Sequence, residues 1–199
     1  MKALWLAIYF LVLIWSGLNP KDYFTWFLEV FPALIGFSII AATFKKFRLT
    51  PLAYSLILIH CLILMVGGHY TYAEVPLFDW IRDSLGTTRN DYDKLGHLAQ
   101  GFIPAIIARE ILVRKNIVTP KSWLNFIVIC ICLAISAFYE LIEWAAALLS
   151  GEAAEAFLGT QGYVWDTQSD MAIALLGAIL ALALLAKAHD RQIKHLTSA

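Results

Sequence analysis

Six apolar runs, separated by shorter polar segments, dominate the pattern of this chain. They lie at about residues 3–18, 23–44, 51–68, 93–113, 123–149 and 165–186. An α-helix rises about 1.5 Å per residue, so runs of this length match a hydrocarbon core of about 30 Å. We therefore expect an all-α fold: a polytopic bundle of six transmembrane helices, with residues 1–199 forming one integral membrane domain. The first run lacks a small-x-small cleavage site, and we expect it to be a retained helix.

The third loop, between the third and fourth runs, is too polar to cross a bilayer. Within Pro76–Leu85, the residues Leu77, Phe78, Ile81 and Leu85 share one helical side, opposite Asp79, Arg82 and Asp83. This pattern is typical of a short helix lying flat at a membrane surface. We expect an interfacial helix here, on the outer side.

Composition supports a membrane protein and indicates its orientation. Hydrophobic residues make up 60% of the chain and charged residues only 15%, so the lipid bilayer is the expected partner. The formal net charge of zero favours no nucleic-acid partner. With six spans, the basic clusters near the span ends all fall on one side, which the positive-inside rule makes cytoplasmic. These clusters are Lys2; Lys45, Lys46 and Arg48; Arg109, Arg114, Lys115 and Lys121; and Lys187, Arg191 and Lys194. Both termini are therefore expected in the cytoplasm.

Ionisable residues inside the apolar runs occur in pairs at helical spacing. Asp93 with His97 and Asp166 with Asp170 are i,i+4 pairs, and Glu140 with Glu143 is an i,i+3 pair, so each pair shares a helix face. Charges in mid-membrane are costly and normally face the protein interior. Measured along the helices, these groups lie at similar depths below the outer surface, together with Glu29, His69 and Gln100. We expect one acidic and histidine-containing pocket near the periplasmic face.

Such a cluster predicts either bound cations or retained protons. The candidate metal ligands are Asp93, His97, Glu140, Glu143, Asp166 and Asp170, and the candidate catalytic residues are His97, Glu140, Glu143 and Asp170. Oxygen-rich ligation favours Mg, Mn or Ca, and the histidines leave zinc or iron open. A divalent ion is the one cofactor expected. No role is expected for His189 or His195, which fall in the polar C-terminal tail.

Three motifs resemble the YjdF-type inner-membrane proteins, a bacterial family without an assigned reaction. They are Asp93-Lys94-x-x-His97, the Phe-Tyr-Glu-x-x-Glu-Trp segment from Phe138 to Trp144, and Trp165-Asp-Thr-Gln-Ser-Asp170. A looser similarity is to VanZ-like membrane proteins, whose pattern usually has an arginine before the last helix, where this chain has Gln161-Gly162-Tyr163. The resemblance implies a multi-pass protein of the bacterial inner membrane.

Three function classes remain open. The pocket can belong to an enzyme that acts on or binds a lipid-like amphiphile through its headgroup, with a divalent metal. It can instead serve a proton-linked or cationic-solute transporter or binding protein. In the third class, a structural subunit, the polar groups only fix helix packing, with Asp93 and Asp166 as helix N-caps. The chain contains no His-Glu-x-x-His, Gly-x-Ser-x-Gly or phosphate-loop motif, so enzyme activity stays open.

Overall fold

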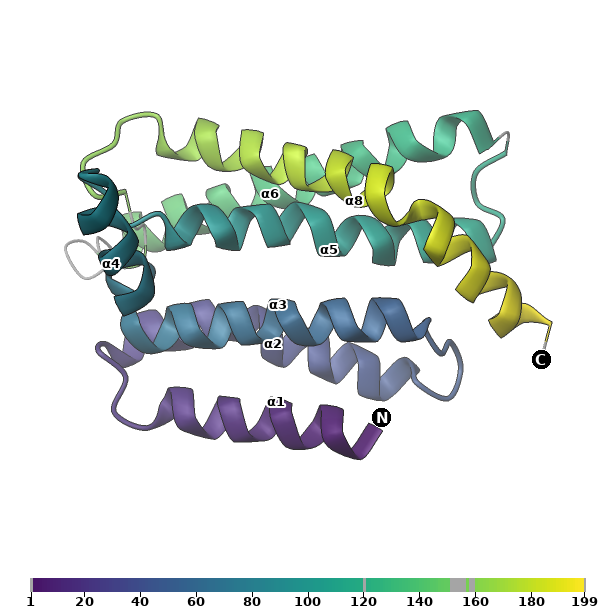
Figure 1. Ribbon diagram of the computed structural model, residues 1–199, viewed down its shortest axis with the longest axis horizontal. Coiled ribbons are helices and arrows are strands. Elements are labelled where there is room, and N and C mark those ends of the chain that lie inside the picture. The colour runs from purple at the N-terminus through teal and green to yellow at the C-terminus, as the bar shows by residue number, and fades with distance from the viewer. Residues whose placement is uncertain (1, 120, 151–156, 158–159, 199) are drawn as a thin grey trace. The chain divides into compact units, whose positions relative to one another are not determined.

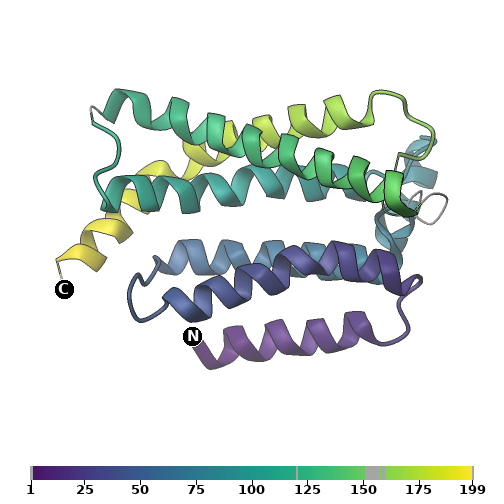
Figure 2. The ribbon, with the colours of Figure 1, turned by 180° about the vertical axis from the view of Figure 1, so that it is seen from behind.

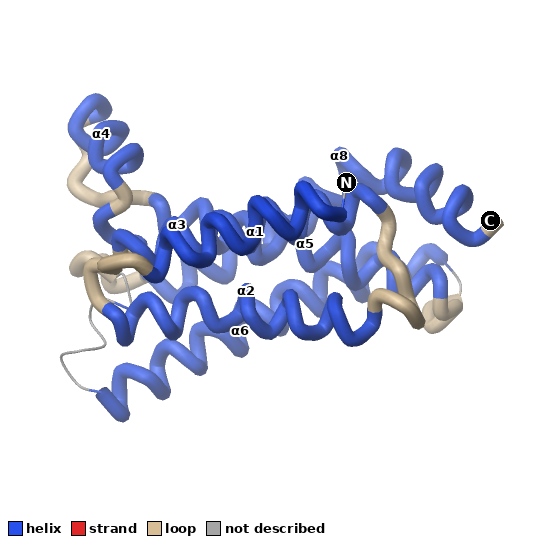
Figure 3. Tube along the Cα trace, turned by 90° about the horizontal axis from the view of Figure 1, so that it is seen from below, coloured by secondary structure: helices blue, strands red, loops and turns tan. Residues whose placement is uncertain are grey.

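All six apolar runs form helices in the computed structural model, which describes residues 2–119, 121–150, 157 and 160–198 (Figure 1). The α-helices are α1 (Lys2–Gly17), α2 (Tyr23–Thr43), α3 (Pro51–Tyr70), α4 (Pro76–Leu85), α5 (Tyr92–Arg114), α6 (Leu124–Ser150) and α8 (Asp166–Thr197). Short 3-10 turns occupy Tyr72–Glu74 and Lys121–Trp123. Within the described ranges every regular element is helical (Figure 3), so the all-α class is confirmed. The loop expected at 150–163 lies partly outside these ranges.

Among the residues that the structure describes, four helices are long and apolar enough to cross a membrane: α2, α3, α6 and α8. Of the other two expected spans, α1 has only 16 residues. Helix α5 has 23 residues, but polar residues interrupt its apolar sequence: His97, Gln100, Arg109 and Glu110. The structure thus supports α2, α3, α6 and α8 as candidate spans. It does not support the expected count of six, because α1 and α5 fall outside this set.

The chain divides into two compact units. The first unit comprises Met1–Ala42, Leu58–Gly96 and Leu141–Asp166, and the second comprises Thr43–Ile57, His97–Glu140 and Thr167–Ala199. Helices α3, α5 and α6 are divided between the two units, and one terminal residue of α2 (Thr43) and of α8 (Asp166) also belongs to the other unit, so a unit contains parts of helices. Each unit is described separately below.

In the first unit, α1 lies beside α2 (Figure 2), and aromatic side chains of α1 contact Phe37 of α2. Tyr9 is fully buried, and its hydroxyl donates to the carbonyl of Ala33 at 3.1 Å. Its ring stacks between Trp5 and Phe37, with centroid distances of 5.4 and 4.8 Å. Burying a tyrosine in apolar surroundings requires a partner for its hydroxyl, and the Ala33 carbonyl supplies one.

Helix α2 begins with a side-chain cap. The backbone N–H of Thr25 donates to Asp22 Oδ1 at 2.7 Å, which satisfies an N–H group that has no partner within the helix. This bond holds the pKa of Asp22 below its usual range. A lowered pKa means that the stabilisation is present at neutral pH and is lost as the pH falls through the carboxyl's pKa.

We expect Asp22→Ala to lower the free energy of unfolding by about 1 kcal/mol. The cause is loss of the cap on α2, and the measurement is the midpoint of thermal unfolding in detergent at pH 7. Asp22→Ser, which keeps a capping oxygen, should restore most of the loss. Equal losses for both substitutions would contradict the capping role.

Helix α4 occupies the residues predicted for the interfacial helix, Pro76–Leu85. Proline occupies its first turn, and Gly86 closes it in the left-handed conformation at φ 67°. Leu77, Trp80 and Leu85 remain 62%, 67% and 72% exposed. The helix itself is confirmed, and an exposed apolar side is what a membrane-surface helix needs.

In the second unit, α5 and α8 approach each other closely at glycines. A Cβ on Gly101 would collide with the carbonyl of Ala174, and one on Gly177 would collide with the carbonyl of Leu98. Ala174 and Ala178 on α8 are fully buried. Small residues at a helix interface allow the backbones to meet, as is common in membrane bundles. This contact fixes the part of α5 that carries His97 against the part of α8 that carries Asp170.

Candidate functional site

His97 is the centre of a buried group of polar side chains in the second unit. It lies on α5 and is 5% exposed, near Glu140 on α6 (7%) and Asp170 on α8 (3%). The two ring nitrogens face different carboxylates. Nδ1 lies 3.8 Å from Glu140 Oε1, and Nε2 lies 4.0 Å from Asp170 Oδ2. We call His97, Glu140 and Asp170 the His97 centre.

Gln100, one helical turn after His97, sets the orientation of the imidazole. Its Oε1 lies 3.1 Å from His97 Nδ1. With this oxygen as acceptor, Nδ1 carries the proton and Nε2 presents its lone pair toward Asp170. The ring of Tyr139 lies edge-on to the imidazole at a centroid distance of 6.4 Å. The residue predicted only as a lining group of the pocket is therefore a partner of the central histidine.

A second ionic group forms in the first unit around Arg89, in the loop between α4 and α5. Its Nη2 donates to Asp93 Oδ2 at 2.9 Å, and its Nη1 pairs with Asp166 Oδ1. The side chains of Arg89, Asp93 and Asp166 are only 13%, 10% and 8% exposed. Lys94 Nζ lies 3.7 Å from the same oxygen of Asp166. We call Arg89, Asp93 and Asp166 the Arg89 cluster.

The loop before α8 is tied to the loop that carries Arg89. The side chain of Gln161 accepts from the backbone N–H of Asn90 at 3.0 Å and donates to its carbonyl at 2.8 Å. Arg89 Nη1 also donates to the carbonyl of Thr160 at 3.2 Å. Gln161 thus stands where the VanZ-like pattern has an arginine, and Arg89 reaches Asp166 from a different loop.

Arg89 was not among the cations that the sequence placed near the buried carboxylates. Asp93 and Asp166 were predicted as metal ligands because acids outnumbered the cations at that depth. The guanidinium of Arg89 pairs with both carboxylates, and together with the nearby ammonium of Lys94 it balances their charge, so these two residues need no metal to be buried. No sequence period pointed to Arg89, because the ion pair depends on how two distant loops meet. The ligand role of Asp93 and Asp166 stays a prediction.

The remaining predicted pocket residues, Glu29, His69 and Glu143, lie in the first unit. Glu29 on α2 is 4% exposed. It packs closely against Gly68 of α3, where an added Cβ would lie 3.3 Å from the Cβ of Glu29. His69 at the end of α3 places Nδ1 at 3.0 Å from the carbonyl of Ser16, and its ring lies against Trp15. Glu143 is half-buried on α6. Their membership of one common pocket stays a prediction.

Two functional candidates in the second unit escaped the sequence analysis. Glu110 on α5 and His189 on α8 are both fully buried, with His189 Nε2 at 3.0 Å from Glu110 Oε2. Glu110 also accepts from the backbone N–H and hydroxyl of Thr50, the latter at 2.8 Å, and from Arg114 at 2.7 Å. The expectation that His189 lies in a solvated tail is wrong, because α8 continues to Thr197. The sequence feature that could have indicated a buried His189 is its i,i+4 spacing from Ile193, which is buried on the same face of α8.

Long apolar helices with exposed hydrophobic faces and buried ionic groups define a polytopic membrane protein. The chain belongs to the family described as "Predicted membrane protein (DUF2238)", which matches residues 1–191. It is 53% identical over 184 residues to the "Inner membrane protein YjdF" of Escherichia coli (strain K12), covering 92% of this chain and 88% of that protein. The resemblance to YjdF-type proteins and the inner-membrane location are thereby confirmed. No solved structure matches the chain.

Proposed function

We propose that the protein is a six-span protein of the bacterial inner membrane with both termini in the cytoplasm. Two features support α1 and α5 as the fifth and sixth spans. With 16 residues, α1 extends about 24 Å, which a locally thinned bilayer accommodates. With 23 residues, α5 extends about 35 Å, and its polar residues His97 and Glu110 are buried among protein groups. Six spans also bring all the basic clusters to one side.

We propose further that the His97 centre binds a divalent cation. The observation that carries this proposal is the 4.0 Å separation of His97 Nε2 and Asp170 Oδ2. It exceeds a hydrogen bond, at about 3.2 Å, and is close to twice a metal–ligand distance of about 2.0–2.1 Å. An ion between these two atoms would be ligated by the lone pair of Nε2 and by a carboxylate oxygen.

The surroundings of His97 also suit a metal ligand. A metal-bound histidine usually donates its other ring N–H to an oxygen acceptor, which fixes the tautomer and the ring plane. Gln100 takes this part, with Glu140 on the same side of the ring. One imidazole and one carboxylate on opposite sides of the ion favour Mn²⁺, whose octahedral coordination allows opposed ligands. Glu140 would then position the ring and accept protons, while Asp170 would be the ligand.

We propose that the protein binds or acts on a lipid-like amphiphile, whose headgroup contacts the bound ion. An ion held near the outer end of the helices would polarise an anionic oxygen of a headgroup entering from the outer leaflet. Glu140 would exchange protons with that headgroup. The exposed apolar side of α4 supports a contact of the protein with the membrane surface.

Proton-linked transport is the second candidate. A transport path needs polar groups at successive levels of the membrane. Glu110 and His189 provide such a level, about 20 Å beyond His97 along α5. Four donors already satisfy Glu110, which favours a fixed structural pair over a moving proton. The cation-binding proposal therefore takes precedence.

Titration of the metal-free purified protein with Mn²⁺ by calorimetry tests the proposal. We expect one site per chain, and we expect His97→Gln and Asp170→Asn each to weaken binding at least about tenfold. Asp190→Asn is the matched control, because this α8 carboxylate pairs with Arg109 and is half exposed. Absence of binding, or equal affinity in all variants, would leave the packing role as the better explanation.

A further inference from the structure

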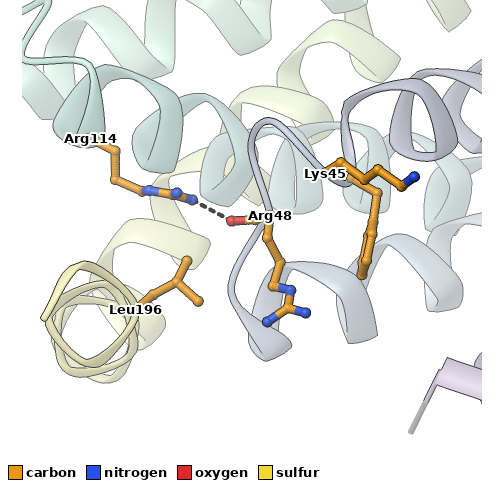
Figure 4. Close-up of a pocket in the computed structure, with 5 residues that line it drawn as sticks. Lys45, Arg48, Arg114 and Leu196 are labelled. Carbon is orange, nitrogen blue, oxygen red and sulfur yellow. Dashed lines mark hydrogen bonds between the residues drawn. The ribbon is translucent and has the colours of Figure 1, made fainter. Parts of the chain in front are cut away.

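A basic cavity of about 500 Å³ opens in the second unit, apart from the His97 centre in residues and chemistry. Five residues line it: Phe44, Lys45, Arg48, Arg114 and Leu196 (Figure 4). Three of them are cationic and two are apolar, and none of the five is acidic. A concave site of this composition is suited to an anion that carries an apolar part.

Arg114 forms a rigid side of this cavity. Its Nη1 donates to the carbonyl of Arg48 at 2.6 Å and to Glu110 at 2.7 Å, and the first of these bonds is drawn in Figure 4. Its Cζ lies 3.9 Å from the centroid of the Phe47 ring, and the side chain is 14% exposed. Both hydrogen bonds come from Nη1, while Nη2 and Nε carry the other three N–H groups of the guanidinium. The orientation of an anion-binding group is thus fixed in advance.

Lys45 and Arg48 supply the more mobile charges. Both are exposed and belong to the loop that follows α2, and Arg48 lies over the Phe44 ring at 5.3 Å. Glu110 offsets the charge of Arg114, so these two residues provide the net positive charge of the cavity. A guanidinium and an ammonium on one wall are the groups that bind phosphate oxygens.

The cavity lies at helix ends. Phe44 follows the last residue of α2, Arg114 is the last residue of α5, and Leu196 is in the last turn of α8. Helix ends are at the level of lipid headgroups, where basic pockets bind anionic phospholipids. Phe44 and Leu196 provide the apolar contact that an acyl chain or glycerol backbone would use, and that a free phosphate ion would not.

We propose that this cavity binds the phosphodiester of an anionic phospholipid, with Lys45, Arg48 and Arg114 as the phosphate ligands. The site is independent of the His97 centre, so either one can fail without the other. In the orientation proposed above, it faces the inner leaflet.

Native mass spectrometry of the full chain, titrated with phosphatidylglycerol or phosphatidylcholine, tests the proposal. We expect phosphatidylglycerol to bind more tightly, and the double variant Lys45→Gln/Arg48→Gln to weaken it about tenfold. Lys46→Gln is the control for each single substitution, Lys45→Gln and Arg48→Gln, because it removes one positive charge from the same loop at an exposed residue that does not line the cavity. Its affinity should stay within about twofold of the parent.

Three results would overturn the proposal. Equal binding of the two lipids would exclude an anionic headgroup site. An equal loss in Lys46→Gln would indicate diffuse attraction to the basic loop. Competition by millimolar inorganic phosphate without preference for phosphatidylglycerol would identify a free-phosphate site and reject the lipid.

Discussion

Replacing Arg89 by glutamine is expected to destabilise the folded protein by about 3–5 kcal/mol. Arg89 pairs with Asp93 and Asp166, whose side chains are 10% and 8% exposed. Without the guanidinium, two neighbouring carboxylates are left in a poorly hydrated place, with the Lys94 ammonium 3.7 Å from Asp166. Removing one partner of a buried ion pair costs far more than the pair itself contributes, because the remaining charge is uncompensated.

Thermal unfolding in detergent measures this effect, with Arg82→Gln as the matched control. Arg82 lies on α4 and also pairs with two carboxylates, Asp79 and Asp83, but these groups are at the surface. Exposed pairs contribute little, so this control should unfold almost as the parent does. Adding Asp166→Asn to Arg89→Gln should recover part of the loss. Similar midpoints for the two arginine variants would contradict a buried cluster.

The second large effect is expected from Gly101→Ala. The added methyl group would overlap the backbone carbonyl of Ala174, which cannot move aside as a flexible side chain can. Overpacking typically costs about 1–3 kcal/mol, and a backbone collision belongs at or above the upper end of that range. Helices α5 and α8 would have to separate, and His97 would move relative to Asp170.

The yield of monodisperse protein and its unfolding midpoint measure this prediction. Gly36→Ala is the matched control, because a Cβ at Gly36 of α2 meets nothing within 4 Å. Alanine has the higher helix propensity, so the control should be neutral or slightly stabilised. A folded Gly101→Ala protein with an unchanged midpoint would refute the close contact between α5 and α8.

Much of the fold was predictable because apolar runs and their polar punctuation determine where helices can form. The predicted range of α4 matches Pro76–Leu85, since Pro76 begins the helix and Gly86 ends it. The last apolar run ends at about residue 186, where hydrophobicity falls, whereas α8 continues to Thr197. The helix continues as an amphipathic segment with His189 and Ile193 buried. The length of an apolar run alone does not predict how far its helix continues as an amphipathic segment.

The candidate site was predictable only as pairs on single helices. Helical spacing identified His97, Glu140 and Asp170 as inward-facing groups, because their positions in apolar runs made exposure to lipid costly. It could not assign which pairs meet across helices. Arg89 lies in a polar loop, where a charge raises no energetic question until the loop is seen packed against Asp93 and Asp166. Glu110 was overlooked beside Arg109, although a charged pair within an apolar run is itself a signal.

The central claim is that His97 and Asp170 hold a divalent ion between them. Electron spin echo spectroscopy of the Mn²⁺-loaded protein tests it most directly, because it detects nitrogen bound to the metal. The chain has five histidines, so the His97→Gln variant is needed to assign the signal. We expect the Mn²⁺ signal to show coupling to a single imidazole nitrogen. This coupling should disappear in His97→Gln and persist in Asp190→Asn. A spectrum with oxygen ligands alone, or a nitrogen signal unchanged in His97→Gln, would contradict it.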